Sequence, residues 1–487
     1  MITLRPHQTE LITKTRQSLT TNKSVLLYAA PGAGKTVMAA YMARGVQDKG
    51  KRAIFACHRD AILNQTAKTF DQFGIDYGYI AAGYPESDKS VYVASIDTLR
   101  KRVTETDMLV VDEAHGSGAK TWNDIIQHYR DAGSYIIGLS GSPCRLDGKP
   151  LRSAFECMVM GPQPKWLIDN GYLSEYRAYA AKRYDLSGLH TRDGDYVQAE
   201  LDERFNRPSI IGDAVDTWSK FANGLRTVVY AFSIKHSHAV VEAFNAAGIP
   251  AAHMDGNTPK KEQRKIIEAF ADGGIKVLSS VEILTTGFDL SAQVGRDVPI
   301  EAVSLLRPTQ SLALAVQMMG RGLRYKPYPA VILDHAGVIA THGLPCQDRE
   351  WSLDGHAPNK KTAGGVIATC ICQECFAVFR PSYACPYCSA VREIDGRKID
   401  IKEGDLAEVD IIAARQAEVD AANDIARKQA RMKQGMAKTL DSMADIAASK
   451  GYAVGWLLKV CRTKGIRVDW ASANLALSEA KRRMGDG

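Results

Sequence analysis

Short apolar runs alternate with longer, more polar stretches along the first third of the chain. The apolar runs, which we expect to be strands, lie at residues 25–28, 52–57, 91–94, 108–111 and 135–139. Helical stretches separate them, for example at residues 37–46 and 61–70. Strands that are apolar throughout are typical of a parallel sheet that is covered on both faces. The pattern therefore predicts an α/β domain, in which ligands bind at the carboxyl ends of the strands.

The same alternation returns after a weaker stretch at residues 151–206, which contains several glycines and many charges. Beyond this stretch the expected strands lie at residues 227–232, 276–279, 303–306 and 331–333, with a helix at 237–246. We interpret the weaker stretch as the crossing between two domains. The pattern thus predicts one parallel-sheet domain over residues 1–165 and a second over residues 166–345.

The composition is that of an ordinary globular protein. Apolar residues make up 45% and charged residues 24% of the 487 residues, which is enough chain for three or more domains. No apolar run reaches the roughly 20 residues that a membrane span requires. The first residues lack the apolar core of a signal peptide, so we expect a cytoplasmic location.

Cysteine placement predicts a metal site after the second domain. Two C-x2-C pairs, Cys372–Cys375 and Cys385–Cys388, supply the four thiolates of a closed, tetrahedral Zn²⁺ site. We predict a structural zinc ribbon over residues 366–392, with Cys370 as a substitute for Cys372; thiols without metal are the alternative. Interleaved aromatic side chains either pack the ribbon, which we favour, or stack on bases; they are Phe376, Phe379, Tyr383 and Tyr387.

The net charge of +7 is concentrated near the end of the chain. Residues 426–483 contain 13 Lys or Arg and 4 Asp or Glu. Residues 405–450 have the composition of one or two long polar helices, residues 451–456 interrupt the pattern, and a last helix is expected at 470–484. We predict a basic helical accessory domain over residues 400–487 that grips a polyanion, with a solvated surface or a partner-docking tail as alternatives.

The most specific motif is A-A-P-G-A-G-K-T at residues 29–36, between an expected strand and an expected helix. Its glycines let backbone N–H groups approach phosphate oxygens, and the helix N-terminus adds partial positive charge. Lys35 is expected to reach the outer phosphates of ATP, and the Thr36 hydroxyl to ligate Mg²⁺. The residues predicted to cradle the phosphates are Pro31, Gly32, Ala33, Gly34, Lys35 and Thr36.

Three further groups of residues fit a nucleotide site. Asp112 and Glu113 follow an expected strand, where the first acid can hold Mg²⁺ through water and the second can activate the attacking water. Gln8 lies just over 20 residues upstream of the phosphate-binding motif at residues 29–36, the P-loop, an offset at which its amide can read adenine. Arg321 and Arg324 share one helix face and suit a developing phosphate charge. Each has an ordinary structural explanation alone, but together with the P-loop they predict an ATPase.

In sequence order, these segments resemble the motifs of superfamily 2 helicases of the DEAH/DEAD-box type. The first-domain motifs are L-R-P-H-Q, A-A-P-G-A-G-K-T, C-H-R-D-A-I-L-N-Q-T, V-A-S-I-D-T-L, D-E-A-H and S-G-S-P. The second-domain motifs are V-V-Y-A-F-S, L-T-T-G-F-D and Q-M-M-G-R-G-L-R. The resemblance covers roughly residues 1–345. Within it, the run of L-T-T-G-F-D, L-R-P-T and G-R-G-L-R is similar, more narrowly, to the corresponding motifs of RadD-type bacterial repair helicases and phage helicases. Residues 290–300 form a longer connection than usual, which we interpret as a tolerated insertion rather than a loop near nucleic acid.

The resemblance implies two tandem RecA-like domains that bind and hydrolyse ATP between them. It further implies that Gln317 faces the phosphates and that Arg321 and Arg324 are arginine fingers. By the same resemblance, Gly287 and Asp289 join contacts to ATP and nucleic acid. Motif III departs from the usual Ser/Thr-Ala-Thr, which bears on how tightly hydrolysis is coupled to movement.

These expectations together predict an ATP-dependent DNA helicase or translocase of replication, recombination or repair, in a bacterium or phage-infected host cell. Its cofactors would be ATP, Mg²⁺ and Zn²⁺. Its partner would be DNA rather than RNA, with a single-strand-binding or replication protein as a further partner. The alternatives are an RNA helicase, the motor subunit of a restriction system, and an ATP-gated DNA-binding or annealing protein that never separates strands.

Overall fold

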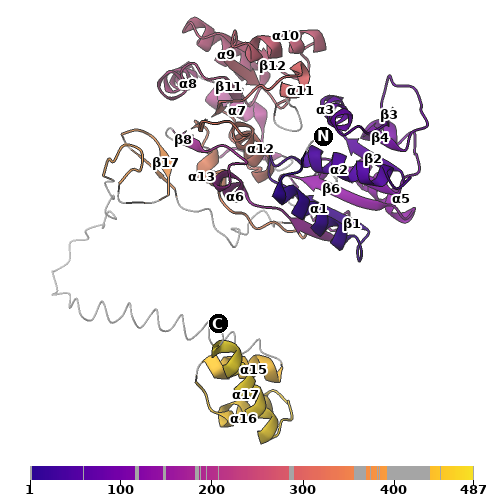
Figure 1. Cartoon of the computed structure of the whole chain (residues 1–487). Helices are drawn as coiled ribbons and strands as arrows, with labels where there is room; N and C mark the ends of the chain where they lie inside the picture. Colours follow the sequence, from indigo (N-terminus) through magenta and orange to yellow (C-terminus); the bar gives the residue numbers. More distant parts are fainter. Residues whose placement is uncertain are drawn as a thin grey trace, which may run out of the picture. The chain divides into compact units, whose positions relative to one another are not determined.

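The chain divides into two compact units, Met1–Ile394 and Asp395–Gly487. The computed structural model describes residues 3–58, 60–115, 120–145, 150–180, 186, 188–192, 195–206, 208–284, 290–355, 369–372, 374–380, 382, 384–391, 439–449 and 451–485. Figure 1 shows the helices and strands of both units. None of the described helices combines the length and the apolar character that a membrane-crossing segment needs.

The first sheet has seven parallel strands in the order β3-β4-β2-β5-β6-β1-β7. Its strands are β1 (Ser24–Tyr28), β2 (Ala53–Cys57), β3 (Tyr77–Ile80), β4 (Val91–Ser95), β5 (Met108–Val111), β6 (Tyr135–Ser140) and β7 (Cys157–Met160). Its helices are α1 (Pro6–Ser18), α2 (Lys35–Gln47), α3 (Asp60–Gln72), α4 (Ile96–Leu99) and α5 (Lys120–Asp131). The five strands that the apolar runs predict are all present. The two edge strands, β3 and β7, were not predicted, because they are only partly buried and lack a continuous apolar run.

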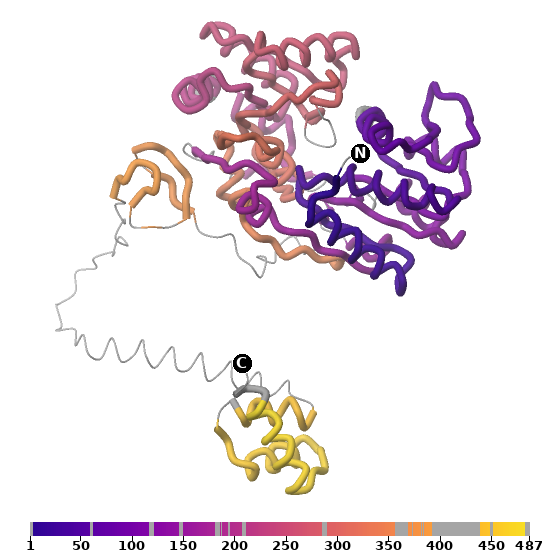
Figure 2. The backbone as a smooth tube through the Cα atoms, viewed as in Figure 1, coloured from indigo at the N-terminus to yellow at the C-terminus, as the bar shows by residue number. Residues whose placement is uncertain are grey.

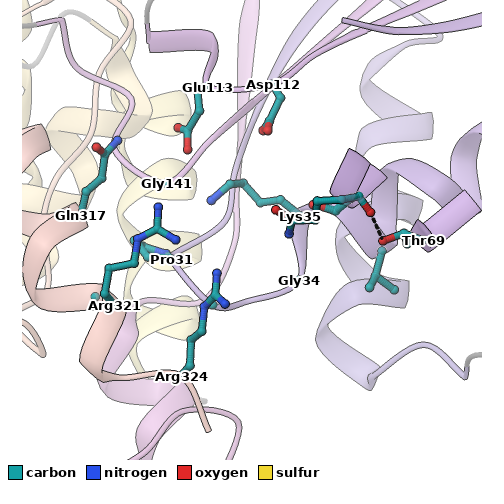
Figure 3. Close-up of a pocket in the computed structure, with 15 residues that line it drawn as sticks. Pro31, Gly34, Lys35, Thr69, Asp112, Glu113, Gly141, Gln317, Arg321 and Arg324 are labelled. Atoms are coloured by element: carbon teal, nitrogen blue, oxygen red, sulfur yellow. Dashed lines mark hydrogen bonds between the residues drawn. The ribbon is translucent and has the colours of Figure 1, made fainter. Parts of the chain in front are cut away.

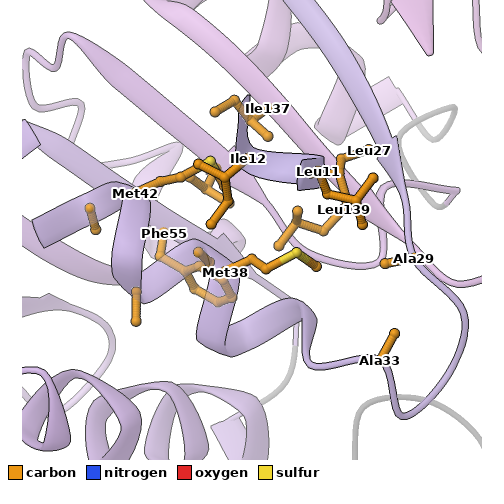
Figure 4. Packing of buried hydrophobic residues seen from close by; sticks show 14 of the residues in the cluster. Leu11, Ile12, Leu27, Ala29, Ala33, Met38, Met42, Phe55, Ile137 and Leu139 are labelled. Carbon is orange, nitrogen blue, oxygen red and sulfur yellow. The ribbon is translucent and has the colours of Figure 1, made fainter. Parts of the chain in front are cut away.

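Helices cover both faces of this sheet, because each central strand is buried on both sides. Leu27 and Phe55 pack with Leu11 of α1 and Met38 of α2 on one face (Figure 4). Neighbouring strand residues such as Leu26 point to the opposite face, where the core includes side chains of α5. The phosphate-binding loop therefore leaves β1 from a rigid, doubly covered sheet.

The second sheet has six parallel strands in the order β12-β13-β11-β14-β15-β8. Its strands are β8 (Tyr176–Ala180), β11 (Thr227–Tyr230), β12 (Ala251–Met254), β13 (Val277–Ser280), β14 (Ala302–Leu305) and β15 (Ala330–Asp334). Its helices are α7 (Gln198–Phe205), α8 (Pro208–Phe221), α9 (Ile234–Ala246), α10 (Lys260–Ala271), α11 (Leu290–Val294), α12 (Leu312–Gly322) and α13 (Val338–His342). A small hairpin of β9 (Thr191–Arg192) and β10 (Asp195–Tyr196) precedes α7. The chain crosses from the first sheet to the second between β7 and β8, through α6 (Pro164–Asp169); the boundary at residue 165 stays a prediction.

Two segments add contacts between the sheets that the sequence pattern did not predict. After α13, residues 344–354 return to the first sheet (Figure 2, orange), where the Leu151 N–H donates to the Leu353 carbonyl at 2.7 Å. Trp351 of this segment packs on Tyr28, with ring centroids 5.8 Å apart. Residues 290–300 contain α11, which packs against α10 and against α3 of the first sheet. Residues 290–300 thus connect the two sheets. We had interpreted this segment as a tolerated insertion or a loop near nucleic acid, and neither interpretation included such a contact.

The predicted ribbon contains a two-stranded antiparallel sheet of β16 (Cys370–Ile371) and β17 (Val378–Phe379). It lies against the outer edge of the second sheet, where Ala377 bridges Tyr179 of β8. The Ala180 N–H also donates to the Phe376 carbonyl at 3.2 Å.

The described part of the second unit is a cluster of three helices, α15 (Leu440–Ser449), α16 (Val454–Thr463) and α17 (Trp470–Gly485). Their apolar sides meet in a small core that includes Met443, Leu457, Cys461 and Leu477. The last predicted helix is present as α17. The predicted interruption at residues 451–456 is shorter than expected, because α16 already begins at Val454. Most of the polar helices predicted over residues 405–450 lie outside the described residues.

Candidate nucleotide-binding site

The phosphate-binding loop connects the end of β1 to the start of α2. Gly32 and Gly34 have φ angles of 83° and 88°, a left-handed conformation that residues with a Cβ rarely adopt. A Cβ at Gly34 would also lie 2.3 Å from the Gln8 amide nitrogen. Both glycines are therefore required by the local backbone, which turns sharply into the N-terminus of α2.

Gln8 lies beneath this loop and is only 3% exposed. Its amide nitrogen donates to the Ala33 carbonyl at 3.0 Å, and its amide oxygen accepts from the Arg5 N–H at 2.9 Å. Both ends of the amide are thus engaged with the backbone, and Gln8 ties α1 to the loop. The adenine-reading role of Gln8 stays a prediction.

The two acids follow β5, with Asp112 buried and Glu113 partly buried. Burial, and then the negative charge of Glu113, raise the pKa of Asp112, while the Lys35 ammonium opposes this shift. Glu113 has a φ of 48°, an uncommon value for a side chain other than glycine. The His115 imidazole lies 3.4 Å from a Glu113 carboxylate oxygen and 3.3 Å from the Ser140 hydroxyl, and burial lowers the pKa of His115.

The second sheet contributes α12 to the same site. Ser311 caps the helix N-terminus by accepting the Leu314 N–H at 3.2 Å. Gln317 reaches across to the first sheet and donates to the Ser142 hydroxyl at 3.4 Å. Gly320 faces Pro31 so closely that a Cβ there would lie 2.8 Å from the Pro31 Cβ. A glycine at this position lets α12 approach the phosphate-binding loop.

These residues enclose a cavity of about 330 Å³ between the two sheets (Figure 3). Ten of the predicted site residues line it: Pro31, Gly32, Gly34, Lys35, Thr36, Asp112, Glu113, Gln317, Arg321 and Arg324. Ala33 belongs to the loop and Gln8 contacts it from behind, but neither is part of the lining. Gly287 and Asp289 lie outside the described residues.

Two further lining residues, Gln65 and Thr69, come from α3 and were missed. They are partly buried polar positions one helical turn apart, and the Thr69 hydroxyl donates to the Gln65 carbonyl at 3.1 Å (Figure 3). Gln65 belongs to the motif C-H-R-D-A-I-L-N-Q-T, although we assigned it no role in the nucleotide site, and Thr69 resembles an ordinary solvated helix position. The packing of α3 beside α2 places both at the cavity.

The charges of the cavity fit a magnesium nucleoside triphosphate. Lys35, Arg321 and Arg324 provide three cationic side chains for phosphate oxygens, and Asp112 and Glu113 provide two carboxylates. A carboxylate and a hydroxyl oxygen are hard donors of the kind that Mg²⁺ prefers. Burial and the neighbouring Glu113 carboxylate raise the pKa of Asp112, and a cation bound beside it would favour the ionised form.

The ribbon brings four of its five cysteines together. The sulfur atoms of Cys372, Cys375, Cys385 and Cys388 lie within 4.8 Å of one another. Two of the separations, Cys372–Cys388 and Cys375–Cys385, are 3.6 Å. A tetrahedral zinc ion with Zn–S bonds of about 2.3 Å requires sulfur separations of about 3.8 Å. The arrangement is compatible with zinc, and Cys370 lies outside the cluster.

Two protein-family models match the sequence. "Type III restriction enzyme, res subunit" matches residues 1–145, and "Helicase conserved C-terminal domain" matches residues 210–326. The first covers all strands of the first sheet except β7, and the second covers all strands of the second sheet except β8 and β15. Between them they include the motifs of both sheets, so the chain has both halves of a helicase ATPase. The resemblance to superfamily 2 helicases seen in the sequence is thereby confirmed at this level. The narrower likeness to DEAH-box and RadD-type helicases stays a prediction.

Similar proteins agree with this class. A 51.5 kDa protein of Lactococcus phage (isolate 7-9) is 27% identical over 469 residues, covering 94% of this chain and 98% of the phage protein. A Saccharomyces cerevisiae protein named "Putative ATP-dependent helicase IRC3" is 27% identical over 326 residues, which cover 62% of this chain and 46% of that protein. The DNA-bound Type ISP restriction-modification enzyme LlaBIII superposes with a TM-score of 0.51 and 15% identity over 68% of this chain and 27% of that chain, which supports the tandem RecA-like fold.

Proposed function

We propose that this chain is an ATP-dependent DNA helicase or translocase that hydrolyses ATP in the cavity between its two RecA-like domains. The observation that carries the proposal is the cavity itself, whose lining combines the phosphate-binding loop and two acids of the first sheet with the arginine pair of α12. A site divided between two domains makes closure of the domains depend on bound nucleotide. Nucleic acid that spans both domains would then be moved with each cycle.

The first part of the site would bind MgATP. Lys35 would contact the outer phosphates, and the backbone N–H groups of the loop would surround the others. Thr36 and Asp112 would hold Mg²⁺, which when bound neutralises phosphate charge.

The second part would act on the transition state. Glu113 would orient the attacking water and accept its proton, since its carboxylate lies beside the phosphate-binding loop in the cavity. Arg321 and Arg324 would neutralise the charge that develops on the transferred phosphoryl group. Gln317, which already reaches the Ser142 hydroxyl, would report the phosphate state across the two sheets.

DNA is the proposed partner, because LlaBIII is described as DNA-bound and the motif order is that of nucleic-acid motors. The cysteine cluster would hold structural Zn²⁺. The basic helices near the end of the chain would add affinity for the phosphate backbone through counterion release.

The test is ATP hydrolysis by the purified protein, alone and with single-stranded DNA, duplex DNA, forked DNA or RNA, at one fixed salt concentration. We expect DNA to raise kcat, with RNA giving little change. A labelled fork in the same buffer distinguishes a helicase, which releases a strand, from an ATP-gated binder, which only shifts the fork. Stimulation by RNA alone would reject the DNA assignment.

Lys35→Ala is the control for the ATP site. Removing the ammonium takes away the contact with the outer phosphates, so we expect hydrolysis to fall to background, at least about a hundredfold below the wild type. Lys49→Ala, an exposed lysine just beyond the end of α2, is the matched variant that should keep full activity. Full turnover in Lys35→Ala would contradict the assignment of the site.

A further inference from the structure

The turn that follows α12 carries Arg324 and is held by the crossing segment between the two sheets. Ser174, in that segment, is 3% exposed. Its hydroxyl accepts the Lys326 N–H at 2.7 Å. The same hydroxyl lies 3.0 Å from the Lys326 carbonyl and 3.1 Å from the Arg324 carbonyl, and its one proton is shared between these two acceptors. The Ser174 N–H donates to the Leu323 carbonyl at 2.9 Å. One serine thus makes contacts along the whole turn.

The Lys326 side chain holds the same turn. Its side chain is buried, and the residue is 6% exposed. The ammonium donates to the Gly322 carbonyl and, at 3.3 Å, to the Arg324 carbonyl. Gly322 is the last residue of α12, and Arg324 lies two residues beyond it. The last carbonyls of a helix have no partner within the helix and carry partial negative charge. A lysine is therefore suited to cap this helix end.

The neighbouring residue of the crossing segment reaches the phosphate-binding loop. Leu173 is paired with Arg324 in an isolated antiparallel bridge. Its side chain lies so close to Gly32 that a Cβ on that glycine would be 2.8 Å from a Leu173 methyl group. Leu173 and Ser174 therefore contact both sides of the cavity, while neither lines it.

We propose that Ser174 and Lys326 form a clamp that fixes the backbone of the Arg321–Arg324 turn relative to the phosphate-binding loop. They are positioning residues for ATP hydrolysis, and this inference rests on the proposed role of the two arginines. A guanidinium group stabilises a transition state only when it is held at the correct place before the reaction, and small displacements are costly. Because the clamp acts on the backbone, it orients Arg324 without contacting nucleotide.

The first experiment compares Ser174→Ala with Ser174→Thr, which keeps the hydroxyl, and Lys326→Met with Lys326→Arg, which keeps the charge. We expect kcat to fall about tenfold in Ser174→Ala and Lys326→Met, while KM for ATP changes less than about twofold. The conservative variants should recover most of the activity. Ser219→Ala, on α8 and outside the cavity, is the matched serine variant that should match the wild type.

The second experiment is a double-mutant cycle with Arg324→Ala. If the clamp acts through Arg324, Ser174→Ala should cost almost nothing further in kcat once the arginine is gone. Thermal unfolding of each variant identifies any that fails to fold, and the Lys326 pair then tests the clamp without Ser174. If Arg324→Ala lowers kcat but Ser174→Ala and Lys326→Met do not, the clamp is wrong. If Arg324→Ala itself keeps full kcat, the proposed role of the arginine is wrong instead.

Discussion

Gly320 stands where α12 approaches the phosphate-binding loop, and the space that a side chain would need is taken by Pro31. Gly141 is in a similar position, since a Cβ there would lie 3.0 Å from the Lys35 ammonium. At the scale of single residues, the cavity thus depends on glycines, which have no side chain, as much as on charged residues. Small residues let backbones from two sheets come close enough for charges on both to meet.

Gly320→Ala is the direct test of this close approach. Alanine favours helix formation, so α12 itself should be stabilised by about 1 kcal/mol. The new methyl group would lie 2.8 Å from the Pro31 Cβ and push the helix away from the loop. We expect kcat for ATP to fall about tenfold in steady-state assays with no loss of thermal stability.

Gly212→Ala on α8 is the control for that substitution, because nothing lies within 4 Å of the Cβ it would add. It should keep wild-type kcat. Equal kcat values in the two variants would show that the space beside Pro31 is not needed for hydrolysis.

Sequence reasoning located most of the cavity because its residues belong to short contiguous motifs. Lys35, Asp112 and Glu113 are each adjacent to a strand or helix end that the apolar pattern predicts. Gln65 and Thr69 could not be found in this way, since their position depends on how α3 packs beside α2. Gln8 was predicted as a site residue. The contacts of both ends of its amide with the backbone were not predictable, because they depend on the fold of the loop above it.

At the scale of helices and strands, burial decided which elements were predictable. Central strands are mostly apolar and were all expected, whereas the edge strands of both sheets, β3, β7, β8 and β12, were not. Residues on partly exposed strands alternate or mix polar and apolar character, which resembles loop sequence. The strand order within each sheet depends on contacts between distant segments, and no local pattern encodes it.

The start of α9 contains a buried histidine that should make the second sheet sensitive to acid. His236 is fully buried and stacks on Phe232 with ring centroids 3.9 Å apart. Neither ring nitrogen has a hydrogen-bond partner among the described residues. Burial lowers the pKa of His236 to about 4.

His236 binds a proton near pH 6.5 in the unfolded chain but only near pH 4 in the folded chain. The neutral, buried imidazole therefore makes its full contribution to the stability of the fold above pH 6.5. The contribution is lost as the pH falls from 6.5 toward 4. We expect about 2 kcal/mol of stability to be lost between pH 7 and pH 5 from this residue. Urea unfolding at the two pH values should show a smaller loss for His236→Leu than for the wild type; equal losses would contradict the prediction.

At the scale of the first unit, the chain crosses between the two sheets more than once. Residues 344–354 return to the first sheet after completing the second, and they contribute Trp351 and Leu353 to its two cores. Arg152 and Asp354 add an exposed ion pair at 2.5 Å, which contributes little because it is solvated. The return therefore depends on apolar packing and on the backbone hydrogen bond between Leu151 and Leu353.

Trp351→Ala tests that packing. The indole is 8% exposed, and its removal leaves a cavity beside Tyr28, so we expect unfolding to become easier by about 3 kcal/mol. Trp166→Ala is the matched variant, since Trp166 is 43% exposed and should cost less than about 1 kcal/mol. Urea unfolding followed by circular dichroism measures both. Equal costs would show that the returning segment adds no stability.

The cysteine cluster makes a separate prediction. Replacing Cys372 and Cys375 with serine removes two of the four sulfur ligands, so the purified variant should contain less than about a tenth of the zinc of the wild type. Replacing Cys57 with serine is the control, since Cys57 lies in β2, away from the cluster. Unchanged metal content in the double variant would reject the zinc site.

The position of the ribbon has a consequence for how the molecule behaves in a concentrated solution. β8 is an edge strand of the second sheet. The ribbon pairs with the backbone of its outer side at Tyr179 and Ala180. An uncovered strand of this kind is a template on which another chain can add a strand of its own. A chelator that removes the metal and unfolds the ribbon would then expose β8. The protein would aggregate through this strand well before either ATP-binding domain unfolds.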